Sequence, residues 1–183
     1  MKGYFGIGAE GTTKGMNLGS LFRSAHAFGA SFVFTIDSQV ARDEIRLSDT
    51  ADTPASLPYY SFADAGSLAL PKGCTLVGIE ITDDAVELPR FRHPRCAAYV
   101  VGGERASLSP ALTALCDHVV RIPTRFSLNL ALAGAIVMYD RLISLGLFPA
   151  RPVMPGGATE ALPTHVYGAP VRKRARAKAG GET

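Results

Sequence analysis

The sequence predicts an α/β fold in which helices cover both faces of a parallel sheet. Short, mostly apolar segments alternate with longer segments whose apolar residues recur at helical spacing. The short segments are apolar nearly throughout, as expected for strands that are buried on both faces. The chain has 183 residues and is 47% hydrophobic, which is enough for one compact domain with a real core.

Five segments are predicted to be strands. The clearest is 31–36, Ser-Phe-Val-Phe-Thr-Ile, because β-branched and aromatic residues fill it. In chain order the predicted strands are 2–7, 31–36, 75–81, 97–101 and 118–122.

The predicted helices lie between these strands. Residues 18–28 carry apolar side chains at helical spacing and are followed by Gly29, a natural end for a helix. Asn17, just before them, is suited to cap the first turn. The other predicted helices are a short one near Ala41, in a segment 37–61 that is otherwise mostly loop, and the segments 62–70, 107–116 and 127–145.

The composition changes after Gly146. Residues 149–171 contain five prolines, and five of the next seven residues are Arg or Lys. We therefore predict one domain over 1–148, followed by a Pro-rich segment and a basic, disordered tail over 149–183. Residues 1–171 hold 14 basic and 15 acidic side chains, so the pI of 8.9 originates in the tail. The tail is either a solvated terminus or an arm that contacts phosphates.

Cysteine and hydropathy patterns exclude several protein classes. Cys74, Cys96 and Cys116 are odd in number and far apart, which argues against a zinc site or a secreted disulfide framework, and no metal is expected. No segment approaches the roughly 20 apolar residues that a membrane span requires. The N-terminus is too short and too rich in glycine for a signal peptide, so a cytoplasmic protein is expected.

A dinucleotide fingerprint near the N-terminus carries little weight. Residues 6–11, Gly-Ile-Gly-Ala-Glu-Gly, match the GxGxxG pattern. That pattern requires a helix that opens at the third glycine, whereas the segment Thr12–Gly15 is loop-like and the predicted helix begins later. A nicotinamide-dependent oxidoreductase is therefore only a distant alternative.

Three other segments place polar residues where a ligand could bind. In the helix 18–28, Arg23 lies opposite the apolar stripe, as an ordinary exposed charge or a functional cation would. Residues 97–104, Ala-Ala-Tyr-Val-Val-Gly-Gly-Glu, place two glycines and a carboxylate at the end of a strand. Residues 119–131, Val-Val-Arg-Ile-Pro-Thr-Arg-Phe-Ser-Leu-Asn-Leu-Ala, place a polar turn after the next strand. Since ligands of open parallel sheets sit outside the carboxyl ends of strands, the three strand ends at 79–81, 102–104 and 122–124 are expected to line one pocket.

In order and separation, the three segments resemble the signature motifs of SpoU/TrmH-type RNA methyltransferases of the SPOUT superfamily. The resemblance covers about residues 4–145. It implies an α/β domain with a C-terminal trefoil knot, S-adenosylmethionine as cofactor, a homodimer, and transfer of a methyl group to a ribose 2′-hydroxyl of tRNA or rRNA. Sequence physics alone would not predict a knot, because knotted chains are rare.

The resemblance also implies roles for individual residues. The positions that match catalytic residues of the family are Arg23, Asn17, Glu104, Ser127 and Asn129. The positions that match its cofactor-binding residues are Ile79, Glu80, Gly102, Gly103, Ile122, Pro123, Ser127, Leu128 and Asn129. Because an arginine is too basic to accept a proton at neutral pH, we expect Arg23 to clamp the phosphate beside the target ribose. Glu104 would position Arg23 or take part in the proton path, or it is simply a carboxylate at a helix N-terminus.

Two departures from the family pattern and several alternatives stay open at this stage. The stretch between Pro123 and Ser127 is shorter than usual and lacks the family's glycine, and no RNA-binding domain precedes the first motif. RNA would then be held by the catalytic domain, a dimer partner or the tail.

The apolar helix 128–139 is either buried within one subunit or a dimer interface, and we favour the interface. A base methyltransferase of the same fold and a non-catalytic RNA-binding module remain the alternatives.

Overall fold

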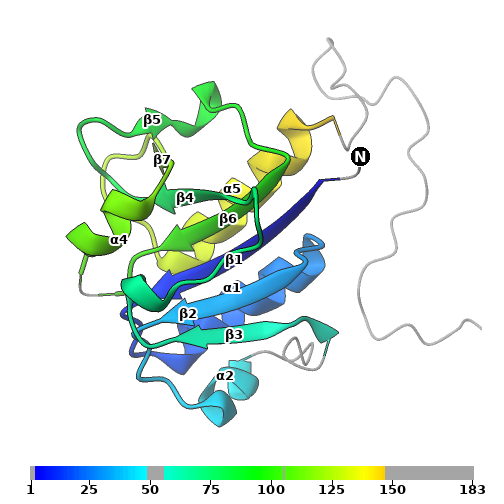
Figure 1. Cartoon of the computed structure of the whole chain (residues 1–183), viewed down its shortest axis with the longest axis vertical. Coiled ribbons are helices and arrows are strands. Elements are labelled where there is room, and N and C mark those ends of the chain that lie inside the picture. The colour runs from blue at the N-terminus through cyan, green and yellow to red at the C-terminus, as the bar shows by residue number, and fades with distance from the viewer. Residues whose placement is uncertain (1–2, 49–55, 105, 147–183) are drawn as a thin grey trace, which may run out of the picture. The chain divides into compact units, whose positions relative to one another are not determined.

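The fold is built on a single parallel sheet. The structure, a computed structural model, describes residues 3–48, 56–104 and 106–146. Within this part of the chain every paired strand is parallel to its neighbours, and the sheet order is β3-β2-β1-β6-β4-β7-β5. The strands are β1 (Tyr4–Glu10), β2 (Phe32–Ile36), β3 (Tyr59–Phe62), β4 (Thr75–Ile79), β5 (Val86–Glu87), β6 (Cys96–Val101) and β7 (His118–Arg121). Their carboxyl ends therefore meet at one edge, toward which the arrows of the central strands point in Figure 1.

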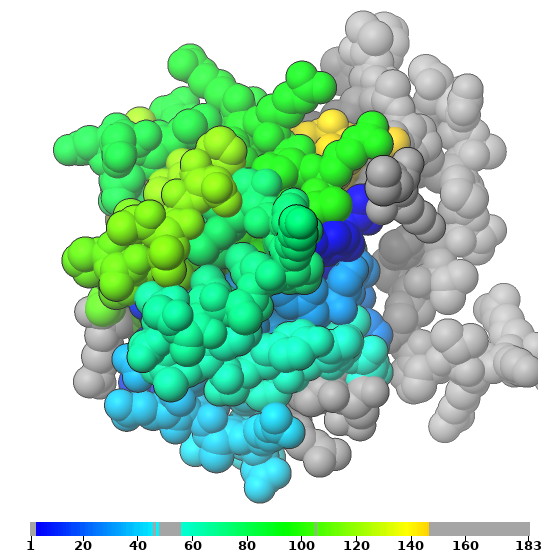
Figure 2. All heavy atoms as spheres, in the orientation of Figure 1, coloured from blue at the N-terminus to red at the C-terminus, as the bar shows by residue number. Residues whose placement is uncertain are grey.

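Helices cover both faces of the sheet, as predicted. One face packs against α1 (Gly15–Ala27), α2 (Arg42–Ser48) and α5 (Leu130–Ser144). The other face, seen in Figure 2, packs against the short helix α4 (Pro110–Leu115) and the 3-10 turn η1 (Ala65–Ser67). Alternate residues of each central strand supply the two cores, so that Ile7 and Tyr99 face the first group and Ala98 and Val100 face the second.

Two of the three glycines of the apparent fingerprint, Gly6 and Gly8, lie inside β1, which continues to Glu10, beyond the predicted end at residue 7. A Cβ on Gly6 would lie 2.3 Å from the ring of Phe32, and one on Gly8 would lie 2.4 Å from the carbonyl oxygen of Phe34. Glycine is therefore required because bulky β2 residues occupy the space beside β1. The dinucleotide interpretation fails, because α1 begins at Gly15 and not at Gly11, the third glycine of the pattern.

Most predicted elements are confirmed, and the errors are confined to the periphery. Residues 62–70 were predicted to form a helix, but β3 ends at Phe62 and η1 follows after Asp64, whose carboxylate accepts a hydrogen bond from the amide of Ser67. The edge strands β3 and β5 were not predicted, since they are short and half exposed.

The helix α5 is tied to the chain that leads into β6. The guanidinium of Arg141 is almost fully buried and donates to the carbonyl oxygens of Arg95 (2.7 Å) and Pro94. Nearby, the ring of buried His93 lies 3.0 Å from the carboxylate of Asp140. A buried charge requires such partners, so these contacts fix the end of α5 against the 93–95 segment.

Several sequence predictions concern residues that the structure does not describe. The boundary near residue 148, the Pro-rich segment and the basic tail lie outside the described residues, so they stay predictions. Within the described part of the chain, no helix is long and apolar enough to cross a membrane, and no group of three His, Cys, Asp or Glu residues could hold a metal ion. Cys74, Cys96 and Cys116 are free and partly buried.

Candidate active site

A cavity of about 470 Å³ opens at the carboxyl ends of β4, β6 and β7. It lies where the sequence analysis expects three strand ends to converge, the position that ligands favour in open parallel sheets. The lining residues come from the start of α1, the three strand ends with their following loops, and the start of α5. They are Lys14, Asn17, Ile79, Glu80, Ile81, Val101, Gly102, Gly103, Glu104, Ala106, Ser107, Arg121, Ile122, Thr124, Ser127, Leu128, Asn129, Leu130 and Ala133.

Two glycines allow the loop after β6 to pack closely against its neighbours. A Cβ on Gly103 would lie 2.5 Å from the carbonyl oxygen of Gly11, at the end of β1. A Cβ on Gly102 would lie 3.0 Å from the carbonyl oxygen of Ala106. Any side chain at these positions would push the loop outward, so the glycines set the shape of the cavity wall.

The side chain of Asn17 connects the three sequence motifs. Its Nδ2 donates to Oε1 of Glu104 (2.8 Å), and its Oδ1 accepts from Nδ2 of Asn129 (3.0 Å). Asn129 in turn caps α5, since its Oδ1 accepts from the amide of Ala131 (2.9 Å). One amide group thus joins the start of α1, the loop after β6 and the start of α5.

The predicted cap of α1 was wrong, but Glu104 lies at the start of that helix. The helix begins at Gly15 after Lys14, and Asn17 lies within its first turn. The carboxylate of Glu104 accepts from the amide (3.2 Å) and the hydroxyl (3.4 Å) of Thr13, just before the helix. Glu104 is therefore a carboxylate at a helix N-terminus, where the helix dipole stabilises its negative charge. The helix concerned is α1, which lies far from Glu104 in sequence.

The ionised form of Glu104 is stabilised by its partners. Burial alone would raise the pKa of Glu104, but hydrogen bonds from Asn17, from its own backbone amide and from Thr13 outweigh it and hold the pKa below its ordinary value. The group is a carboxylate at neutral pH with both oxygens engaged. It is therefore suited to positioning Asn17 and poorly suited to accepting a proton.

Two further carboxylates hold the loops around the cavity. Glu10, nearly buried at the end of β1, accepts from the amide (2.7 Å) and hydroxyl (2.6 Å) of Ser109, which caps α4. Glu80, predicted as a cofactor-binding residue, accepts from the amide of Leu108 (2.9 Å). Sequence reasoning missed Glu10, whose only signal was its place at the carboxyl end of a central strand.

The structure brings most predicted site residues together, with two exceptions. Every predicted catalytic or cofactor-binding residue lines the cavity except Arg23 and Pro123, which are both exposed. Arg23 lies six residues beyond Asn17 on α1, or about 9 Å along the helix axis, away from the strand ends. Glu104 binds Asn17 and Thr13, so the predicted contact with Arg23 is not found within one chain.

Comparison with known proteins identifies the family. The SpoU rRNA methylase family matches residues 5–139. The chain belongs to this family. The resemblance seen in the sequence is thereby confirmed, and the matched residues include all three motifs and every residue of the cavity.

Individual relatives are more distant. Over 135 residues the chain is 25% identical to the mouse tRNA (guanosine(18)-2′-O)-methyltransferase TARBP1. The match covers 69% of this chain but only 8% of TARBP1. The SpoU methyltransferase AviRb from Streptomyces viridochromogenes is 26% identical, with a TM-score of 0.69 over 78% of this chain and 60% of AviRb. The chain thus spans less than a tenth of TARBP1 and about three-fifths of AviRb.

Two solved relatives contain the predicted cofactor. AviRb in complex with AdoMet aligns with a TM-score of 0.70 at 25% identity, over 79% of this chain and 59% of AviRb. An AdoMet-bound rRNA methyltransferase from Sinorhizobium meliloti also gives a TM-score of 0.70, over 79% of this chain and 58% of that one; at 20% identity it supports the fold alone. The prediction that the family's cofactor is S-adenosylmethionine is confirmed by the AviRb complex.

We predict that Glu104→Gln makes stability less dependent on acid pH. Because the folded-state pKa of Glu104 is depressed, its ionised form stabilises the protein above the unfolded-state pKa of about 4.3, and that contribution is lost as the pH falls through the folded-state value. At pH 7 the variant should unfold at a lower urea concentration than wild type. The free energy of unfolding should fall by less than about 1 kcal/mol, because the site is partly exposed. This difference should shrink between about pH 5 and 3. A difference that stays constant with pH would contradict the assignment.

Proposed function

We propose that this domain transfers a methyl group from S-adenosylmethionine to a ribose 2′-hydroxyl of tRNA or rRNA. The observation that carries the proposal is the single cavity in which all three motifs meet, joined through Asn17 to Glu104 and Asn129. The activity of the mouse relative, 2′-O-methylation of a tRNA guanosine, supports the choice of ribose over base.

The cavity residues fit S-adenosylmethionine, which has a flat adenine and a polar amino-acid end. Apolar side chains of Ile79, Ile122 and Leu128 offer a surface for the adenine, and the bare backbone at Gly102 and Gly103 lets amides and carbonyls come close. When bound, this cofactor supplies an electrophilic methyl group on a sulfonium, which passes to the ribose oxygen as the O–H bond loses its proton to solvent and a thioether remains.

The chain's own residues would then position the reactants. The hydrogen bonds that link Glu104, Asn17 and Asn129 hold the cavity walls in a fixed arrangement. This lowers the entropic cost of aligning the cofactor with the ribose hydroxyl. Ser127, exposed at the cavity, supports the loop that holds the cofactor. The guanidinium of Arg23 binds the phosphate beside the target ribose and stabilises charge on its oxygen, and it cannot act as the base.

We further propose a homodimer formed through α1 and α5. Along α5, Leu132, Ile136 and Tyr139 recur at helical spacing and are 59%, 39% and 48% exposed. Along α1, exposed Met16 and Arg23 are seven residues apart and share one side of the helix. The two helices pack together, and the rings of Phe28 and Tyr139 lie 6.4 Å apart. A second copy on this face would bury the apolar stripe. It would also bring Arg23 of one subunit near the cavity of its partner.

The proposal includes the family's trefoil knot. Residues 80–95 leave β4, form β5 at the outer side of β7, and return to β6 on the other side of β4. The helix that follows β7 is held by this same connection through Arg141 and Arg95. These contacts support a chain that passes through the loop made by 80–95.

The first test is chemical identification of the product. Bulk RNA from a strain that lacks the protein should accept labelled methyl groups from S-adenosylmethionine, and the label should appear in a 2′-O-methylnucleoside. A 2′-O-methyl group removes the nucleophile of alkaline cleavage, so the label should be recovered in alkali-resistant dinucleotides. Label in a base would favour a base methyltransferase instead. If a calorimetric titration with S-adenosylmethionine showed no binding, the domain would instead be a non-catalytic RNA-binding module.

We predict that Arg23→Lys lowers turnover about 10- to 100-fold. Lysine keeps the charge but loses the bidentate geometry of the guanidinium, which is equivalent to losing one or two charge-assisted hydrogen bonds. The dissociation constant for S-adenosylmethionine should stay within about twofold, because Arg23 does not line the cavity of its own chain. Arg90→Lys, at a position with an 83% exposed side chain, serves as the control and should keep wild-type turnover. Near wild-type turnover of Arg23→Lys would exclude the clamp.

We predict that Ile136→Glu converts the dimer into a monomer. A buried, unpaired carboxylate in the interface would cost far more than dimerisation gains at that position, whereas on an exposed surface it is harmless. Light scattering at micromolar concentration should report the mass of one chain, and circular dichroism should show that this chain is still folded. Leu115→Glu, at a 51% exposed position on α4, should leave the mass of the dimer intact. A wild-type protein that is already monomeric would refute the interface.

A further inference from the structure

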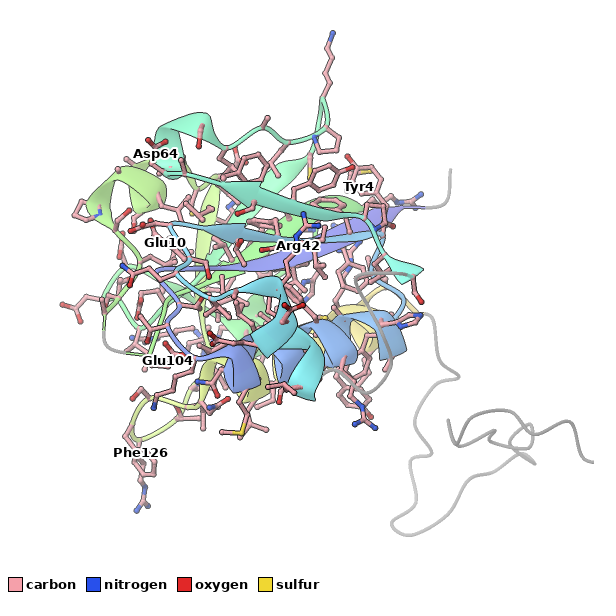
Figure 3. The ribbon with its side chains drawn as sticks, turned by 90° about the horizontal axis from the view of Figure 1, so that it is seen from below. Tyr4, Glu10, Arg42, Asp64, Glu104 and Phe126 are labelled. Atoms are coloured by element: carbon pink, nitrogen blue, oxygen red, sulfur yellow. The ribbon has the colours of Figure 1, made fainter. Side chains whose placement is uncertain are left out.

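The loop between β7 and α5 exposes an aromatic ring beside the cavity. Phe126 is 77% exposed, although Thr124 and Ser127 on either side of it line the cavity. Figure 3 shows Phe126 at the tip of this loop, projecting from the end of the molecule at which Glu10 and Glu104 lie. A single exposed apolar residue is ordinary on a protein surface, but this one stands at the mouth of the proposed active site.

The ring is not needed to form the loop. The hydroxyl of Thr124 lies 2.9 Å from the carbonyl oxygen of Phe126 and 3.3 Å from that of Ile122, so the turn is closed by polar contacts. A third bond, from the amide of Thr124 to the carbonyl oxygen of Ile122 (2.8 Å), tightens it further. The backbone thus presents the ring outward in a defined position and leaves it free to contact a ligand.

The charge around the ring suits a polyanion. Arg125, next to Phe126, is exposed, and so is Lys14 on the cavity rim. The carboxylates of Glu10, Glu80 and Glu104 at this edge each accept hydrogen bonds from backbone amides. An exposed cation beside an exposed aromatic ring, with a second cation on the rim of the cavity, is a combination that suits single-stranded nucleic acid, with phosphates on the cations and a base on the ring.

We propose that Phe126 stacks on an unpaired base next to the target nucleotide and that Arg125 binds the adjoining phosphate. This inference rests on the proposed function, since it assigns the substrate contacts of the same site. The ring selects an unstacked base and not a paired one, so the substrate region would be a loop, a bulge or another single-stranded segment of the RNA.

The absence of tryptophan from the chain provides a direct test. Phe126→Trp carries a single tryptophan, whose fluorescence should be quenched when an adenosine decamer is added at low salt. An abasic ribose-phosphate decamer, which has the charge but no bases, should cause little quenching. Leu47→Trp, at an 84% exposed position on α2, is the matched control and should not respond to either decamer. No difference between the two variants would overturn the proposal, as would a signal that depends on protein concentration and not on RNA, because the ring would then face a second copy.

Kinetics separate this inference from the function on which it rests. Phe126→Ala should raise the KM for the methyl-accepting RNA about tenfold, with unchanged cofactor affinity and an unchanged melting temperature. Arg125→Ala should reduce the slope of log affinity against log salt concentration by about 0.7, as expected for one lost phosphate contact on a single strand. Wild-type KM in Phe126→Ala would overturn the stacking role and leave methylation standing. Failure of the wild-type protein to bind S-adenosylmethionine would refute the proposed function, whatever the tryptophan reports.

Discussion

The side-chain amide of Asn17 is the contact on which the proposed site depends. It donates to a carboxylate 87 residues later in the chain and accepts from a second amide 112 residues later. Only a group with both a donor and an acceptor can do this, because Glu104 offers only acceptors and Asn129 has already used its oxygen to cap α5. An aspartate or a lysine at position 17 would break one of the two bonds. The amide therefore sets the relative placement of α1, α5 and the loop after β6.

This arrangement assigns the polar groups around the cavity to structure more than to proton transfer. The carboxylates of Glu10, Glu80 and Glu104 each hold a backbone amide, so they keep the loops that follow β1, β4 and β6 in place. Among the three, Glu104 has a pKa held below its ordinary value by its hydrogen bonds, so it is a poor proton acceptor. Methyl transfer to a hydroxyl places modest demands on a base and strict demands on alignment, so a site built mainly to align its reactants is chemically reasonable.

The central fold could be predicted from the sequence, because burial on both faces makes strands such as β2 apolar at nearly every position. The edges could not, since β3 and β5 are short and carry mixed residues. The start of α1 was misplaced because its first turn is fixed by a tertiary contact: Gly15 packs against Glu44 of α2, where a Cβ would lie 2.6 Å from that side chain. The family resemblance pointed to most of the cavity-lining residues, but it could not show that Arg23 lies outside the cavity of its own chain.

Phe126 illustrates a division between the inner and outer parts of the loop after β7. The inner residues, such as Leu128 and Asn129, match the family's motif and line the cavity, where a shared cofactor would constrain them. The tip, at Arg125 and Phe126, does not line the cavity, and hydrogen bonds of the Thr124 hydroxyl hold the turn that carries it. A change at the tip is therefore expected to leave both the fold and the cavity intact. Selectivity is most easily placed there, since it can change without cost to the residues that align the reaction.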